Sequence, residues 1–230
     1  MIKYFQKLKA KKGFTLVELI VVIAIIGVLA AILIPTMLNY VTSSRVTSAD
    51  TTASEIKKTI DNFLTEADTL GYGMLLSSSA KCSVKGECDS SGKWTLTIGA
   101  GAGLTSAEGG TTGIAAFKTK TGIGEWKASA SIEHGKTRVD AGSDATAQLA
   151  WKLMDAFPDV KGVSFGAYLE GGKTMYVAYT ADSDKADFSV KLEDFTAGSS
   201  EWNKATAGVD SKGYIVGTAP KLPISTGSKS

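Results

Sequence analysis

One run of apolar residues near the amino terminus constrains this chain more than any other feature. The 21 residues from Phe14 to Ile34 contain a single charged side chain, Glu18. A helix of that length would be about 31 Å long, roughly the hydrocarbon thickness of a bilayer. Residues 1–12 carry five lysines and no acid. Lysines on that side alone predict a cytoplasmic amino terminus and a body on the other side of the membrane.

The rest of the chain has a different charge balance. Of its 25 basic residues, five are the leading lysines, so the remaining 20 stand against 23 acidic residues. A weakly acidic body argues against specific nucleic-acid binding. A single histidine, His134, offers little to a hydrolase with a histidine base or to a multi-histidine metal site. We therefore expect no enzyme activity and no cofactor.

Composition and length leave several interpretations of the apolar run open. A secretory signal peptide would have a shorter apolar core, and Ala30-Ala31 is a poor cleavage site because another apolar run follows it. A plain membrane anchor explains the length and the lysines but not Glu18. A carboxylate at the centre of a spanning helix costs about 2.5–3.5 kcal/mol, less near an end, and usually has a partner.

The residues around Glu18 support a third interpretation. The string KGFTLVELI, from Lys12 to Ile20, resembles the amino terminus of type IV pilins and the related pseudopilins. The shared features are a short basic leader ending in Gly13, then Phe14, then a glutamate as the fifth residue after the glycine. The resemblance covers roughly residues 1–40 and implies that a prepilin peptidase cuts between Gly13 and Phe14. It further implies that Phe14 is N-methylated.

A physical argument accompanies this resemblance. Cleavage would expose an α-amino group on Phe14 that is positively charged at neutral pH, at the edge of the hydrocarbon. An isolated charge is costly there, and so is an isolated Glu18, but Phe14 of one subunit and Glu18 of its neighbour would neutralise each other. The resemblance implies that this contact sets the stagger of subunits in a filament. The alternative is that Glu18 extends to a lipid headgroup.

Gly27 and Pro35 also match the pattern of the family. Proline removes a backbone donor inside a helix, and glycine weakens the same stretch. The resemblance suggests that residues 27–35 unwind in a filament core, whereas a simple curve in one long helix is the alternative.

The apolar pattern beyond Pro35 becomes one-sided and predicts an amphipathic continuation over residues 36–70. Apolar residues recur there at steps of three and four: Val46, Ala49, Ala53, Ile56, Ile60, Phe63, Leu64 and Ala67. With residues 14–35 this makes one helix of about fifty residues. Residues 71–230 are expected to form a globular, β-rich head. The predicted fold class is α+β and pilin-like, with the long helix packed on an antiparallel sheet.

Within the head, alternation and turn signals predict several elements. Ser143 or Asp144 is expected to cap a second helix that Pro158 stops, near residues 143–157, and Gly171-Gly172 signals a hairpin. Residues 143–230 could form a second pilin-like unit, although one elaborated head is favoured. The expected strands are residues 94–98, 125–133, 162–169 and 174–180, a strand marked by Phe188, Val190 and Leu192, and one at Tyr214–Val216.

The remaining candidate sites have simpler explanations. Cys82 and Cys88 lie in a segment expected to be loop-rich, residues 71–113, and outside the membrane a disulfide between them is the default expectation. A metal site there is weaker, because two cysteines and one distant histidine are a poor ligand set. The acidic loop with Asp182, Asp184 and Asp187 is read as solvated and not as a calcium site. Trp94, Trp126, Trp151 and Trp202 are read mostly as core residues, with Trp202 the one to test for exposure.

The sequence thus predicts a structural subunit of a type IV pilus-like surface filament, cleaved after Gly13 and polymerised through its amino-terminal helix. Adhesion, motility or DNA uptake would be its role. Expected partners are other copies or other pilins, a prepilin peptidase, a membrane platform, an assembly ATPase and, before assembly, the membrane. One alternative is a pseudopilin of a type II secretion or competence system. Another is a membrane-anchored adhesin or carbohydrate-binding module that never polymerises.

Overall fold

The computed structural model describes residues 14–76, 80–99, 113–118, 120, 122–181 and 215–220. It divides into two compact units, residues 1–43 and 44–230, which we call the amino-terminal unit and the head unit. The leader at residues 1–13, the acidic loop with Asp182, Asp184 and Asp187, and Trp202 lie outside the described residues. So does the strand expected around Phe188, Val190 and Leu192.

The first element is the helix α1, Leu16–Leu70, 55 residues long with Pro35 inside it. The helix continues without a break through Gly27 and Pro35. Within the described residues, α1 is the one helix long and apolar enough to cross a membrane. The predicted long amino-terminal helix is therefore confirmed.

In the head unit, the apolar stripe of α1 faces the core as predicted. The buried residues are Ala49, Ala53, Ile56, Ile60, Phe63, Leu64 and Ala67. Val46, also expected in this stripe, is half-buried. The three- and four-residue spacing of these side chains gives α1 one apolar face, which is covered by the sheet and by a second helix.

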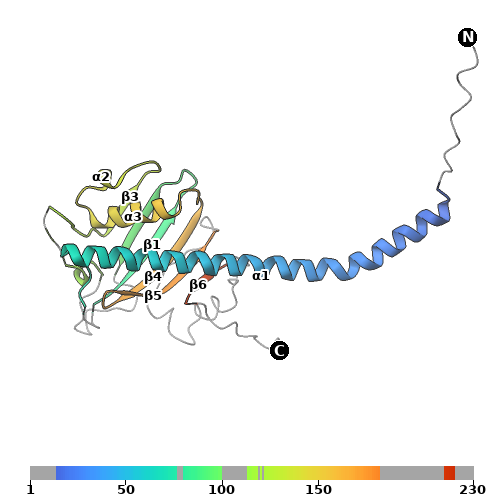
Figure 1. Cartoon of the computed structure of the whole chain (residues 1–230), viewed down its shortest axis with the longest axis horizontal. Coiled ribbons are helices and arrows are strands. Elements are labelled where there is room, and N and C mark those ends of the chain that lie inside the picture. Colours follow the sequence, from blue (N-terminus) through green and yellow to red (C-terminus); the bar gives the residue numbers. More distant parts are fainter. Residues whose placement is uncertain are drawn as a thin grey trace, which may run out of the picture. The chain divides into compact units, whose positions relative to one another are not determined.

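The described strands form one six-stranded sheet in the order β3-β2-β1-β4-β5-β6, in which every neighbouring pair is antiparallel (Figure 1). A single sheet agrees with one elaborated head and not with a second pilin-like unit. The strands are β1 Lys81–Cys88, β2 Trp94–Gly99, β3 Ser129–Ile132, β4 Val163–Glu170, β5 Lys173–Thr180 and β6 Gly217–Ala219.

The hairpin between β4 and β5 turns at the predicted glycines. Gly171 and Gly172 have φ values of 55° and 84°. Positive φ at both central residues is the requirement of a two-residue turn whose twist matches that of the strands, and glycine meets it without steric cost.

Helix α3, Ala145–Ala156, follows a short helix α2, Arg138–Ala141, and a 3-10 turn η2 lies earlier at Gly113–Ala116. Asp144 caps α3, because its carboxylate accepts a hydrogen bond from the backbone N–H of Ala147 at 3.0 Å. The predicted cap and the predicted helix are confirmed. Helix α2 was not expected. Thr137 is its N-cap, and the backbone N–H and hydroxyl of Thr137 both donate to the Asp140 carboxylate.

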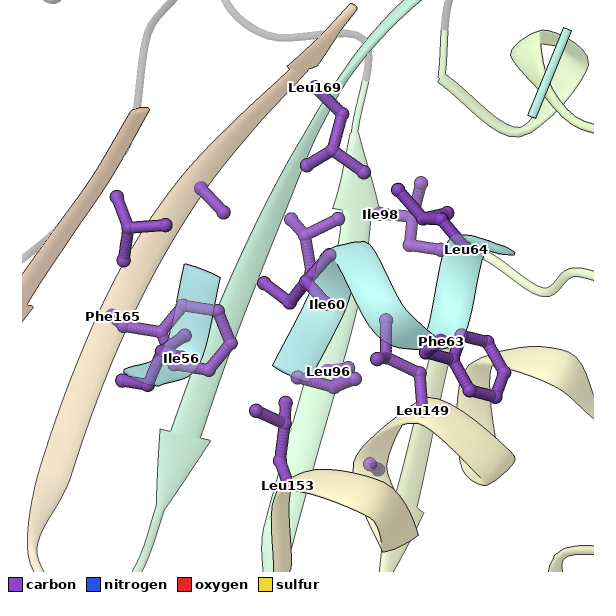
Figure 2. Packing of buried hydrophobic residues seen from close by; sticks show 14 of the residues in the cluster. Ile56, Ile60, Phe63, Leu64, Leu96, Ile98, Leu149, Leu153, Phe165 and Leu169 are labelled. Carbon is purple, nitrogen blue, oxygen red and sulfur yellow. The ribbon is translucent and has the colours of Figure 1, made fainter. Parts of the chain in front are cut away.

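The core lies where α1 and α3 meet the sheet. Figure 2 shows side chains of α1, such as Ile60 and Phe63, among Leu96 of β2, Phe165 of β4 and Leu149 of α3. Burial of each such side chain contributes about 1.5–3 kcal/mol. One continuous cluster thus joins the helices to the sheet.

Two boundaries predicted from the sequence were wrong. The strand expected at residues 125–133 is confined to Ser129–Ile132, because Glu125 pairs with Asp144 at the start of α3 and Lys127 exchanges two hydrogen bonds with the Thr146 hydroxyl. The last strand, expected at Tyr214–Val216, is β6 at Gly217–Ala219.

Residues 81–88 were expected to lie in a loop but form β1, an inner strand of the sheet. Its core-facing positions are Cys82, Val84, Gly86 and Cys88, and all four are buried. Among these four, only Val84 is a typical strand residue, so the sequence does not display the alternation of apolar and polar residues that predicts a strand. Buried cysteines act here as small apolar side chains.

Candidate assembly surface of the amino-terminal helix

The start of α1 is stabilised by its own side chains. The Glu18 carboxylate accepts a hydrogen bond from the backbone N–H of Thr15 at 2.8 Å and another from the Thr15 hydroxyl at 2.7 Å. The Thr15 hydroxyl oxygen in turn accepts from the backbone N–H of Glu18 at 3.2 Å. This reciprocal arrangement is a capping box, which satisfies two backbone donors that a helix start leaves unpaired.

The capping box gives Glu18 a partner within its own chain. Thr15-x-x-Glu18 is the sequence pattern of a capping box, so this partner was predictable beside the expected neighbouring amine and lipid headgroup. A carboxylate in the first turn also interacts favourably with the helix dipole. Phe14 is 83% exposed, and Gly13 lies outside the described residues.

The surface of α1 in the amino-terminal unit is apolar and uncovered. None of its most apolar 18-residue window is buried. Individual side chains such as Leu16, Ile23 and Ile34 are more than half exposed. An exposed apolar surface of this extent needs lipid or protein against it.

Gly27 and Pro35 each change this helix locally. Apart from the adjoining backbone of α1 itself, nothing lies within 4 Å of a Cβ built at Gly27, so this position of the apolar surface faces open space. Small residues at such positions let another helix approach closely. Pro35 has no N–H to donate to the preceding turn. Beside it, the Thr36 hydroxyl donates to the Leu33 carbonyl at 2.9 Å, which adds a side-chain hydrogen bond to the turn that contains the proline.

The disulfide expected between Cys82 and Cys88 is absent, and both cysteines are free and buried. They lie six residues apart on β1, a separation of about 20 Å at 3.3 Å per residue. A disulfide needs Cα atoms about 4.4–6.8 Å apart. The expectation was wrong because it assumed a turn around Lys85-Gly86, where the chain is fully extended.

The tryptophans of the head unit behave mostly as expected. Trp94 and Trp126 are buried, and Trp151 is half-buried. The indole N–H of Trp126 donates to the Tyr72 carbonyl at 2.6 Å, and its ring stacks on Phe117 with centroids 3.9 Å apart. The rings of Trp94 and Trp126 are thus part of the core and offer no surface to a sugar. His134 lies in an exposed turn.

A charged cluster connects α1 to the helices α2 and α3. The Glu66 carboxylate pairs with Arg138 and, at 2.9 Å, with Lys152. The hydrogen bond from Lys152, with a further contribution from Arg138, holds the pKa of Glu66 below its ordinary value of 4.5 despite partial burial. Among the described residues, no group of three or more His, Cys, Asp and Glu side chains could hold a metal ion.

Comparison with known proteins agrees with the geometry of the amino-terminal unit. The prokaryotic N-terminal methylation motif matches residues 8–34. A fimbrial protein of Pseudomonas aeruginosa is 46% identical over 59 residues, which are 26% of this chain and 38% of that protein. The type IV major fimbrial protein FimA of Dichelobacter nodosus is 44% identical over 54 residues, 24% of this chain and 35% of that protein.

A longer match reaches fimbrial protein Q of Moraxella bovis, 35% identical over 104 residues, 44% of this chain and 66% of that protein. The chain thus spans well under half the length of the first two relatives named and about two thirds of this one. No solved structure matches the chain.

Proposed function

We propose that this chain, which belongs to the type IV pilin and pseudopilin family, is a structural subunit of a type IV pilus-like filament. The observation that carries the proposal is the uncovered apolar surface of α1 with one acid, Glu18, in its first turn. Packing of such helices side by side replaces lipid contacts by protein contacts. The fimbrial relatives and the methylation motif support the same conclusion.

The parts of the chain then take separate roles. Residues 1–13 are a leader that a prepilin peptidase removes after Gly13, leaving an N-methylated Phe14. Residues 14–35 span the membrane before assembly, with the amino terminus on the cytoplasmic side, and form the filament core afterwards. Residues 36–70 continue the helix into the β-rich head formed by residues 71–230. A membrane platform and an assembly ATPase would extract the subunit from the bilayer.

Assembly in this proposal requires Glu18 to exchange partners. In the chain by itself the carboxylate is held by Thr15. In a filament it would pair with the Phe14 α-amino group of a neighbouring subunit, an interaction between full charges in a place shielded from water. Gly27 and Pro35 would let the packed helices approach closely and adjust locally.

Variants of the capping box separate its local role from the role in assembly. Glu18→Gln retains the hydrogen-bonding geometry of a capping box but removes the charge, because glutamine also serves at this position. Thr15→Ala removes the hydroxyl but retains the charge. Each variant is expressed in the native host, and filaments sheared from the cells are quantified against total subunit. Glu55→Ala, at another exposed glutamate of α1, is the matched control.

The proposal expects Glu18→Gln to lose filaments while the subunit accumulates in the membrane, and Thr15→Ala and Glu55→Ala to retain most of them. Normal filament yield from Glu18→Gln would contradict the role of the charge. Loss with Thr15→Ala alone would assign the motif to helix capping.

Mass spectrometry of the amino-terminal peptide tests processing and separates the alternatives. N-methylated Phe14 in sheared filaments is the expected result. Processed Phe14 confined to membranes would favour a pseudopilin. An intact Met1 would leave a membrane-anchored protein and overturn cleavage after Gly13.

A further inference from the structure

The two cysteines of the chain lie on one strand of the sheet, at positions that a disulfide between them could not keep. Cys82 and Cys88 are its only cysteines, and both lie on β1 with 0% exposure. β1 is an inner strand, paired with β2 along one side and with β4 along the other. Cys82 lies opposite Leu169, and Cys88 lies opposite both Trp94 and Val163.

In the folded head the thiols are far apart and shielded. The extended strand separates their Cα atoms by about 20 Å, three times the distance that a disulfide allows. The Cys88 thiol donates to the Val160 carbonyl at 3.1 Å. Burial, with the nearby Asp89 carboxylate, raises the pKa of Cys88 to about 11, and burial raises the pKa of Cys82 as well. Thiol oxidation needs access and a thiolate, and the fold withholds both.

In the unfolded chain the same two thiols are close in sequence. Five residues separate them, including Gly86, which makes a tight turn inexpensive. The entropy cost of closing so short a loop is small. In the unfolded chain, β1 is not formed, so its extended geometry does not prevent a disulfide between Cys82 and Cys88.

We propose that folding of the head and formation of the Cys82–Cys88 disulfide exclude each other, so that the dithiol is the native form and early oxidation keeps the head unfolded. In the oxidising step, one thiolate attacks a disulfide-bearing oxidant and releases one thiol from it. The second cysteine thiolate then displaces the other half of the oxidant, forming the S–S bond. The cysteines lose two electrons and two protons, and the oxidant becomes two thiols.

Formation of the disulfide would remove an inner strand, β1, from the sheet. A ring of seven residues cannot follow the extended path of β1, so closure would remove β1 from both β2 and β4. Val84, which is fully buried in the core, would leave it too. The proposal does not depend on filament assembly, and it concerns the head unit alone.

The test oxidises the full-length chain, purified in detergent micelles, in two different orders. Diamide is the probe, because its N=N bond accepts the same two electrons and two protons and leaves no adduct. One sample is treated while folded. The other is unfolded in guanidinium chloride, treated, and then refolded by dilution. Tryptophan fluorescence reports native packing, since Trp94 lies opposite Cys88.

Trypsin cleavage locates the bond, because Lys85 lies between the two cysteines. A disulfide would leave the peptides of residues 82–85 and 86–93 linked. The folded sample should retain two free thiols and native fluorescence. The sample oxidised when unfolded should yield linked peptides and lose native fluorescence, and dithiothreitol should restore it.

Recovery of native fluorescence with the peptides still linked would overturn the proposal, whichever sample gave it. The double variant Cys82→Ala, Cys88→Ala is the control and should refold equally with and without diamide. If this variant does not fold, restoration of the wild-type chain by dithiothreitol still separates ring closure from irreversible damage.

Discussion

The ring of Phe165 on β4 lies against the bare Cα of Gly86 on β1. The two residues are direct partners across the strands, and a Cβ built at Gly86 would lie 2.0 Å from a ring carbon of Phe165. Glycine at this point of an inner strand therefore makes room for an aromatic ring that α1 covers. Glycine has a low propensity for strands, but at this position it allows the Phe165 ring to pack in the core.

Gly86→Ala should destabilise the head because the new methyl group displaces the Phe165 ring. Overpacking of this kind costs about 1–3 kcal/mol. Urea unfolding followed by tryptophan fluorescence measures the loss as a lower midpoint. Lys81→Ala, on the opposite face of β1, is the control and should change the midpoint little. An unchanged midpoint for Gly86→Ala would show that the ring moves aside without cost.

Asp61 of α1 should matter as a hydrogen-bond acceptor. Its carboxylate accepts from the backbone N–H of Thr174 at 2.7 Å. Asp61→Ala leaves this donor unpaired and should cost about 1–3 kcal/mol. Asp61→Asn retains an acceptor oxygen and should cost less, although it also loses the ion pair with Lys57. Equal losses in urea unfolding would contradict a role for this hydrogen bond.

The stability of the head should depend on pH through Glu66. Its pKa is lowered in the folded state, so the folded chain releases this proton more readily than the unfolded chain does. The stabilisation is fully present above the ordinary pKa of 4.5 and is lost as pH falls through the lower, folded value. It amounts to at most about 1 kcal/mol per ion pair, because these side chains are partly exposed.

Thermal unfolding of Glu66→Gln from pH 3 to pH 7 checks this expectation. The variant should have a lower Tm than the wild type above about pH 5, and the two should converge toward pH 3. Glu55→Gln, at an exposed position of the same helix, should follow the wild type throughout. A Tm difference that stays constant over the whole range would exclude titration of Glu66 as its cause.

Pro35→Ala should stiffen the amino-terminal unit. Proline inside a helix costs about 3 kcal/mol relative to alanine, and its replacement restores a backbone donor. Hydrogen exchange in detergent micelles should therefore slow at the amides surrounding residue 35. Leu38→Ala, a replacement on the exposed surface of the same helix, should leave exchange near residue 35 unchanged. Faster exchange in Pro35→Ala would contradict this interpretation.

Periodicity made much of the fold predictable from the sequence. The three- and four-residue spacing in α1, the glycine pair after β4 and the cap at Asp144 are local signals, and the structure confirms each of them. β1 was missed because cysteine and glycine take most of its core-facing positions. The capping box has a local pattern too, but a carboxylate in an apolar run was expected to pair with a group outside its own chain.

Other contacts could not have been read from local patterns. Glu66 meets Arg138 and Lys152 only because three helices come together, and Asp61 meets a strand 113 residues away in sequence. Such pairs depend on the order of strands in the sheet. A sequence without aligned relatives gives no direct signal for that order.

The hydrogen bond from the Thr218 backbone N–H to Asp50 joins residues 168 positions apart. It places β6, one of the last described segments, against one of the first helical turns of the head unit. Contacts of such long range form slowly, because the chain between them must be ordered first. The native edge of the sheet can therefore close only after residue 218 has been synthesised. Under the proposed function, in which the head lies beyond a membrane, β6 would therefore join the sheet only after residue 218 has crossed that membrane.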